Sequence, residues 1–146
     1  MSFDLALNKG DISIGSDGDL KKVRDTPKAI QDVLKILHSP VGSNPFFPQI
    51  GNSLTIQNIG ENINRQFAET KATASIQNSL QLLQAIQARQ ETLQVVTAGE
   101  KIIGIMDISA EQDPTEPRQF NIKVTVITGD QTIVDLPSFS LKTTID

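Results

Sequence analysis

The segment 38–54 constrains the fold of this chain more than any other stretch. It holds three prolines and two glycines, which exclude a continuous helix or a central strand, because proline lacks a backbone donor and glycine admits positive φ. It also carries Phe46, Phe47, Ile50 and Leu54, which is too much apolar surface for a solvated linker. We therefore expect a connection folded back over the core, with these apolar residues inserted between the elements that it joins. We call this segment the clasp.

The composition favours one globular domain. At 146 residues the chain is long enough for one hydrophobic core and short for two, and its apolar content of 38% is in the globular range. A formal net charge of -4 gives no electrostatic attraction to nucleic acid or to an anionic membrane. There is no cysteine, which excludes disulfides and thiolate metal sites. The aromatic residues are six phenylalanines only, so a stacking surface for bases or sugars is not expected.

The sequence lacks the signals of membrane insertion and export. No stretch approaches the roughly 20 apolar residues that a membrane-spanning helix needs. The start of the chain, residues 1–4, does not have the basic and then apolar layout of a signal peptide. We therefore expect a soluble protein that is made and assembled in the cytoplasm.

The first part of the chain has strand-like patterns. Apolar residues alternate over 3–7, which predicts an extended lead-in. The runs 11–14 and 19–23 flank a glycine- and aspartate-rich turn at 15–18, and this arrangement predicts a β-hairpin. We interpret the aspartates as turn residues, because the ligand order and the closing glutamate of a calcium loop are missing. No metal site is expected.

A first helix is predicted to begin at Thr26 and Pro27, a capping side chain followed by a residue that suits the first helical turn. Pro40 ends it. His38, the single histidine, lies in the last turn, where it complements the helix dipole; we favour this role over that of a ligand or general base. The predicted core stripe consists of Ile30, Val33, Leu34 and Leu37.

Two more helical segments follow the clasp, at about 56–67 and 76–86. Because Thr70 and Thr73 could both cap a new start, these segments are either separate helices or one kinked rod. The second one has a glutamine-rich outer face, which is either a solvated surface or a surface that packs against other subunits. Its members are Gln77, Gln81, Gln84 and Gln87.

The last part of the chain predicts an antiparallel sheet. The runs 93–97 and 102–108 form one predicted hairpin, and the runs 119–128 and 132–136 form another around Gly129 and Asp130. The run 102–108 is apolar at both alternating sets of positions, which suggests burial on both sides.

The expected architecture is therefore a single α+β domain. It comprises a hairpin and three helices with the clasp in 1–91, an antiparallel sheet in 92–136 and an extended tail in 137–146. The tail also alternates like a strand, and it pairs either with its own sheet or with the edge of a neighbouring chain. We expect that a chain ending at Leu136 still folds.

This order of elements resembles the baseplate wedge proteins of contractile-tailed phages that initiate the tail sheath, a family with relatives in type VI secretion baseplates and contractile bacteriocins. The likeness covers nearly the whole chain, and its specific part is the first half. It is carried by 4–7, 10–12, 19–20 and 30–37, and above all by the clasp positions Gly42, Phe46, Phe47, Pro48, Gly51 and Leu54.

The resemblance implies a structural role in the tail baseplate of a virion, after assembly in the host cytoplasm. The implied partners are the tail sheath protein, other wedge subunits, and tube or hub proteins, with no cofactor and no small-molecule substrate. Strands of the sheath would add to edges of the C-terminal sheet. The residues expected at this interface are Ile103, Ile105, Ile122, Val124, Phe139, Leu141 and Ile145.

One motif of that family is displaced here. Many members carry a Glu-Pro-Arg triplet between the long helix and the sheet, where it serves wedge assembly. This chain has no such triplet there, and we expect Arg89 and Glu91 to replace its contacts. The triplet at 116–118 lies in a later loop, so we assign it no function.

Two other classes of function remain as alternatives. Some relatives are labelled lysozyme-like, and a peptidoglycan hydrolase would need two opposed carboxylates, one of them in an apolar pocket. The candidate acids Glu61, Glu69 and Glu91 lie on polar faces or at helix ends, and nucleophile, phosphate-loop and metal motifs are missing, so catalysis is not expected. The second alternative is a cytoplasmic adaptor unrelated to tails.

Overall fold

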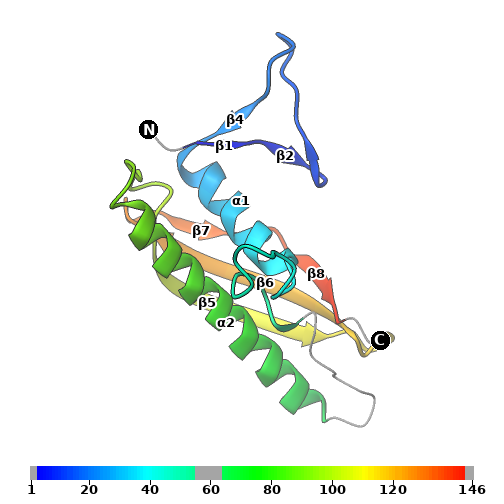
Figure 1. Cartoon of the computed structure of the whole chain (residues 1–146). Coiled ribbons are helices and arrows are strands. Elements are labelled where there is room, and N and C mark those ends of the chain that lie inside the picture. Colours follow the sequence, from blue (N-terminus) through cyan, green and yellow to red (C-terminus); the bar gives the residue numbers. More distant parts are fainter. Residues whose placement is uncertain (1–2, 55–63, 144–146) are drawn as a thin grey trace.

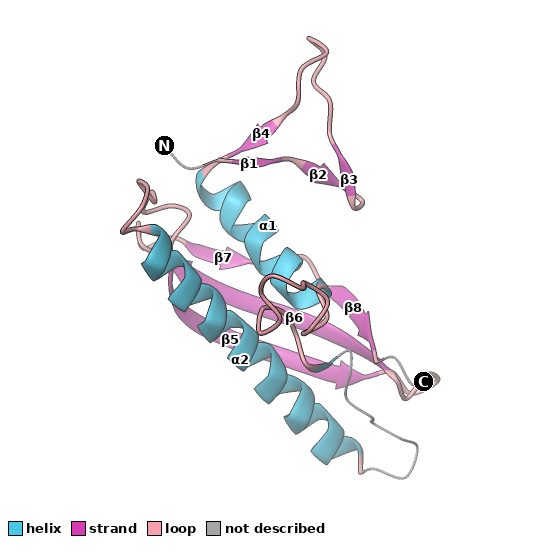
Figure 2. Ribbon diagram, viewed as in Figure 1, coloured by secondary structure: helices cyan, strands magenta, loops and turns pink. Residues whose placement is uncertain are grey.

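The computed structural model describes residues 3–54 and 64–143. It has an α+β architecture in which two helices cover one face of an antiparallel sheet, while an arm of short strands projects from one end (Figures 1 and 2). The helices are α1 (Asp25–His38) and α2 (Arg65–Gln90). The sheet consists of β5 (Ile102–Gln112), β6 (Gln119–Thr128), β7 (Ile133–Asp135) and β8 (Phe139–Lys142). The predicted strand at 93–97 is wrong, because these residues form a turn and an irregular connection.

β6 is the central strand of the sheet. β5 pairs with one side of it, and β7 and β8 share the other side, β7 beside 125–127 and β8 beside 119–122. Pro137 lies between these two short strands, which fits its inability to donate to a ladder. Of the two pairings that the sequence left open for the tail, the structure therefore shows the one with its own sheet, through β8. Ile145 lies outside the described residues.

The core lies between the sheet and the helices. The alternation predicted for 119–128 is confirmed, because Phe120, Ile122, Val124 and Val126 are all buried on the face that the helices cover. They pack in one cluster with the predicted stripe of α1 and with the buried face of α2. Fully burying side chains of this size contributes about 1.5–3 kcal/mol each, and this makes the sandwich of helices and sheet the stable part of the molecule.

β5 is not buried on both sides, contrary to the expectation for 102–108. The pairing with β6 shifts register between Ile102 and Gly104 and again between Ile105 and Asp107, so Ile103 and Met106 are extra residues in bulges. Both side chains are exposed. The bulges restore Ile105 and Ile108 to the core side, where they pack against the buried cluster. A continuous apolar run in the sequence therefore reflects two bulges rather than two buried faces.

The N-terminal strands pair differently from the predicted hairpin. β1 (Asp4–Leu5) pairs with β4 (Lys22–Val23), and β2 (Leu7–Asn8) pairs with β3 (Asp11–Ile12). The expected pairing of 11–14 with 19–23 is reduced to one bridge between Ile14 and Leu20. Lys9 and Gly10, both with positive φ, form a tight turn between β2 and β3 in place of the predicted turn at 15–18. We call residues 4–23 the arm.

The described part of the chain contains two helices, not three. α1 begins at Asp25, one residue before the predicted cap, and ends at His38 as predicted. α2 is one continuous helix from Arg65, and its start is capped by Asn64, whose side chain accepts a hydrogen bond from the Gln66 N–H. Thr70 and Thr73 do not cap, because their hydroxyls donate to carbonyls one turn earlier. The predicted segment 56–63 lies outside the described residues.

The clasp is folded over the core at its base but not at its tip. Leu54 is buried and Ile50 is partly buried, as expected, whereas Phe46 and Phe47 are 84% and 54% exposed, which contradicts their predicted insertion. Four prolines and glycines between 40 and 48 keep the tip outside the helical layer, so its aromatic pair points away from the core.

Buried polar contacts fix the base of the clasp. Asn52 is fully buried; its side chain donates to the Leu37 carbonyl and accepts from the Leu54 N–H and the Ser75 hydroxyl. The Ser79 hydroxyl donates to the carbonyl of Gly51. The small buried residues of α2 thus serve as the docking surface of the clasp, a function that a 3.6-residue hydrophobic pattern does not reveal.

Candidate functional site

The edge of β5 that faces away from β6 is the candidate functional site. Within the described residues, no strand pairs with this edge. β5 has 11 residues, whereas the opposite edge of the sheet is built from two short strands broken at Pro137. An open edge of this length offers a row of backbone donors and acceptors to another chain.

α2 fixes both ends of this edge. At one end, the Ile102 N–H donates to Gln87 Oε1 at 2.9 Å, and Gln84 Nε2 donates to the Ile102 carbonyl at 3.4 Å. At the other end, the Gln112 N–H donates to Glu69 Oε1 at 3.0 Å. Side chains of one helix therefore take the place of a neighbouring strand at the two ends and leave the middle open.

The pairing with β6 identifies the open backbone groups. In a strand, residues whose side chains share a face direct their N–H and C=O groups towards the same edge. Ile105, Ile108 and Ala110 share the core face with Ile102 and Gln112, as their partners in β6 show. Since the backbone of Ile102 and Gln112 points to α2 and away from β6, the backbone of these three residues points to the open edge.

A groove runs beside this part of β5. It has a volume of about 540 Å³ and lies between one face of α2, including Glu69, Thr73 and Gln77, and the strand residues Ser109, Ala110 and Glu111. The groove is open to solvent on its outer side and has mixed polar and apolar walls. Because the groove lies next to the unpaired edge, a strand added there could form backbone hydrogen bonds with β5 and side-chain contacts with α2.

Glu69 is held as an anion at the end of the groove. The Arg65 guanidinium donates to Glu69 Oε1 at 2.9 Å and, together with the Gln112 N–H, keeps the pKa of this carboxyl below its usual value. An ionised carboxylate forms a stronger hydrogen bond to a backbone donor than a neutral group does. Glu69 is therefore suited to anchoring β5 and not to donating a proton.

The glutamines of α2 do not all lie on its outer face. Gln87, predicted on that face with Gln84, is fully buried, and its amide also donates to the Glu100 carbonyl at 2.8 Å. Its spacing of four residues from buried Leu83 was a usable signal, because residues four apart share a helix face. Gln77 and Gln81 are exposed, as predicted.

The residues predicted at the sheath interface lie in different environments. Ile103 is exposed in the first bulge, and Ile105 is partly buried at the open edge. Ile122, Val124 and Leu141 are core residues whose side chains are covered by the helices, so a partner cannot reach them in the folded chain. Phe139 is partly buried, with its ring centroid 5.1 Å from that of His38.

The two residues predicted to make wedge contacts lie at the end of α2. Arg89 is exposed in the last helical turn. Glu91 follows the helix and forms an ion pair with Lys101, whose Nζ is 2.8 Å from Glu91 Oε1. This pair joins the end of α2 to the start of the sheet, so Glu91 has a role within the chain.

Within the part of the chain that is described, no cluster of three or more acidic or histidine side chains could hold a metal ion. No described helix is long and apolar enough to cross a membrane.

The chain is similar in fold to a protein of known structure. A crystal structure of a candidate tail lysozyme from Geobacter sulfurreducens superposes with a TM-score of 0.58 at 13% identity, covering 80% of this chain and 89% of that one. No protein-family model matches the sequence, and no curated protein matches it. At this identity the superposition shows a shared fold and no more.

Proposed function

We propose that this chain is a structural baseplate protein of a contractile phage tail or a related injection machine, and that it joins wedge subunits to the first sheath ring by accepting a strand of the sheath at β5. The observation that carries the proposal is the open middle of the β5 edge between two ends tied to α2. The fold shared with a protein named as a tail lysozyme supports the setting.

The energetics of strand addition suit this edge. Each main-chain hydrogen bond that forms contributes about 1 kcal/mol net, and the groove supplies contacts that set the register. The ties at Ile102 and Gln112 hold β5 in place before the partner arrives, which lowers the ordering cost of binding. Several copies arranged in a ring would add avidity without any new contact.

The opposite edge is a weaker acceptor. β8 has four residues and β7 has three, and no N–H is available from Pro137 between them. The two edges therefore provide one position each at which to test the proposal. In β5, the N–H of Ala110 points to the open edge. In β8, the backbone of Phe139 and Leu141 points to β6, so the N–H of Ser140 points to the opposite edge of the sheet.

The test replaces Ala110 by proline, which removes one outward donor while leaving the ladder to β6 intact. Introduced into a strain that lacks the native gene, Ala110→Pro is expected to give tails without attached sheath in electron micrographs, although the purified variant stays folded by circular dichroism. Ser140→Pro is the control and is expected to give normal tails. Normal sheaths with Ala110→Pro would exclude β5 as the acceptor.

A hydrolase is the second candidate, because the similar structure is named for a lysozyme and because Glu69 and Glu111 line one groove. A glycosidase needs a protonated acid, whereas the pKa of Glu69 is lowered by Arg65 and its carboxylate holds β5. We therefore propose a non-catalytic role. Peptidoglycan turnover by the purified protein that is abolished in Glu69→Gln or Glu111→Gln, with the fold retained, would reverse this assignment.

The adaptor alternative differs in its genetic setting. A tail protein is expected to be encoded beside genes for sheath, tube and spike proteins, and its deletion should remove assembled tails. Normal contractile tails in a deletion strain would favour an adaptor role.

A further inference from the structure

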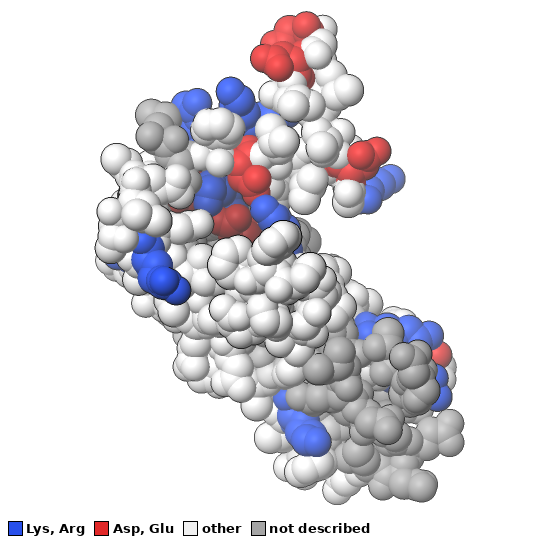
Figure 3. Space-filling model, viewed as in Figure 1, with Lys and Arg blue, Asp and Glu red and all other residues white. Residues whose placement is uncertain are grey.

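The clasp and the outer side of α2 form an uncharged face. No charged residue occurs at 39–54 or at 72–88, the two segments that supply nearly all of the clasp and most of α2. Figure 3 shows this region as a continuous white surface over the middle of the molecule, with the charged side chains gathered towards the ends. A surface of this kind has a low desolvation cost when it is covered by another protein.

The clasp tip presents two exposed aromatic side chains. Phe46 and Phe47 are largely exposed. Their loop is ordered from within: Asn44 Oδ1 accepts from the N–H groups of both residues, at 3.0 and 3.4 Å, and the Gly42 N–H donates to the Pro48 carbonyl at 2.8 Å. Because the loop is already held in shape, docking of these rings loses little conformational freedom.

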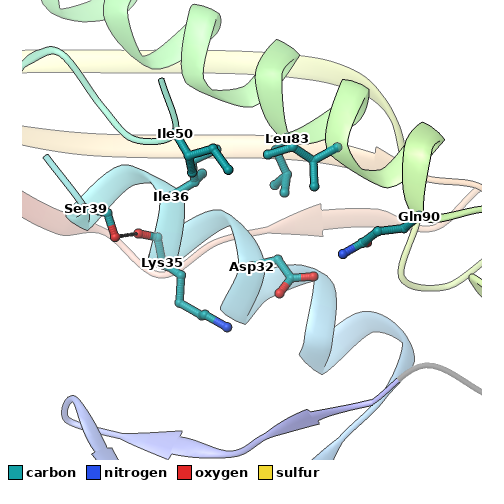
Figure 4. A pocket seen from close by; sticks show the side chains of 8 residues that line it. Asp32, Lys35, Ile36, Ser39, Ile50, Leu83 and Gln90 are labelled. Atoms are coloured by element: carbon teal, nitrogen blue, oxygen red, sulfur yellow. Dashed lines mark hydrogen bonds between the residues drawn. The ribbon is translucent and has the colours of Figure 1, made fainter. Parts of the chain in front are cut away.

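Beside the clasp lies an apolar hollow between α1 and α2. Its volume is about 260 Å³, and its apolar lining consists of Ile36, Ile50, Leu83 and Ile86. Figure 4 shows the first three of these side chains, from α1, the clasp and α2. A dry apolar cavity of about 150 Å³ already accommodates a benzene ring in proteins, so this hollow has room for one phenylalanine side chain. Ile50 belongs to the clasp itself, and its N–H donates to the Phe47 carbonyl at 3.0 Å, so the aromatic tip and the hollow are neighbours.

The charged residues on the rim of the hollow are already paired. Asp32 accepts from Lys28 Nζ at 2.7 Å, and Lys35 forms an ion pair with Asp4. An uncharged loop that covers this rim would therefore leave no charge without a partner. The clasp of a second copy meets this requirement, because its residues 39–54 carry no charge.

We propose that two copies of this chain associate across this face, with Phe47 of each copy inserted in the α1–α2 hollow of the other. A surface that carries a projecting ring and a matching hollow side by side is self-complementary, which is the condition for a two-fold symmetric dimer. This pairing is independent of the strand-acceptor function, since the β5 edge takes no part in it. It describes the free protein, before any tail assembles.

Sedimentation velocity over a range of protein concentrations tests the dimer. Phe47→Ala is expected to weaken dimerisation at least tenfold, because aromatic anchors in apolar pockets dominate such interfaces. Phe67→Ala is the matched control, because Phe67 is also 54% exposed but lies on α2 far along the chain from the hollow. The dissociation constant of the dimer should not change in this variant. A native protein that stays monomeric at all concentrations would overturn the proposal.

Mixing two variants tests the knob-and-hollow contact itself. Phe47→Ala keeps an intact hollow, and Ile86→Lys keeps an intact Phe47. Each variant alone should therefore be monomeric, while the mixture regains one of the two contacts and forms heterodimers.

The chain has no native cysteine, so Phe47→Cys and Ile86→Cys can be mixed and oxidised without side reactions. A disulfide between these two variants is expected, and none between Phe67→Cys and Ile86→Cys. Equal cross-linking in both pairs, or dimers of each variant alone, would refute the contact.

Discussion

At the scale of single residues, Gly51 shows how tightly the clasp base is built. Its φ of +138° is one that other residues rarely adopt, and a Cβ at this position would lie 2.6 Å from the Ser39 carbonyl oxygen and 2.8 Å from the Pro40 carbonyl carbon. Both contacts are with backbone, so they cannot be relieved by a side-chain rotation. Glycine is required here by conformation and by space together.

We predict that Gly51→Ala lowers the free energy of unfolding by about 3 kcal/mol, which combines backbone strain with the clash. The measurement is urea denaturation followed by circular dichroism. Gly42→Ala is the control, because Gly42 also has a positive φ but a Cβ there would meet nothing within 4 Å. Gly42→Ala should lower the free energy of unfolding by about 1–2 kcal/mol, from the unfavourable backbone conformation alone. Equal effects of the two substitutions would show that the packing at Gly51 is looser than described.

The lowered pKa of Glu69 predicts that the stability of the folded chain depends on pH. Its pKa is lowered from the usual 4.5 in the folded chain, so its stabilising effect is complete above that value and is lost as the pH falls through the lower, folded pKa. Glu69→Gln should therefore be less stable than the native chain at neutral pH, with a difference that shrinks below about pH 4.5. Thermal unfolding between pH 7 and pH 3 measures this. A difference that stays constant with pH would mean that the charge does not contribute.

At the scale of elements, β8 is part of the fold and not a free tail. Phe139 and Leu141 pair with Ile122 and Phe120, and Leu141 is buried. A chain ending at Leu136 would lose β8 and uncover one side of the central strand, which is a physical reason against the expectation that it still folds. The alternation of the tail predicted a strand, but not which chain it would pair with.

Leu141→Ala is predicted to lower the free energy of unfolding by about 2–4 kcal/mol, since it removes buried methyl groups and leaves a cavity. Lys142→Ala should change it by less than about 0.5 kcal/mol, because Lys142 is exposed and its ion pair with Glu116 is at the surface. Chemical denaturation of both variants tests the pair of expectations. A small effect of Leu141→Ala would restore the view of β8 as a dispensable tail.

At the scale of the whole molecule, the features that could be predicted from the sequence are those that produce a regular spacing of apolar residues. The α+β class, α1 with its core stripe and the alternating β6 follow from the spacing of apolar residues. The bulges at Ile103 and Met106, the burial of Gln87 and the exposed tip at Phe46 depend on tertiary contacts that spacing does not carry. The same is true of the candidate site: the strand was identified, but its open edge is defined by side chains of α2 that the pattern assigned to the surface.

The arm is predicted to unfold independently of the sandwich. Its residues 7–21 are largely exposed. It is tied to α1 by Gln31, whose side chain forms hydrogen bonds with Asp4, Leu5 and Leu7, and by the ion pair of Lys35 with Asp4. A segment with so few buried contacts opens at low free-energy cost, whereas the amides of β6 open only with global unfolding. Hydrogen exchange should therefore be fast in the arm and slow in β6. Gln31→Ala should accelerate exchange at 5–13 alone and leave β6 unchanged. If exchange in β6 accelerates to the same degree, the arm and the sandwich unfold as one cooperative unit.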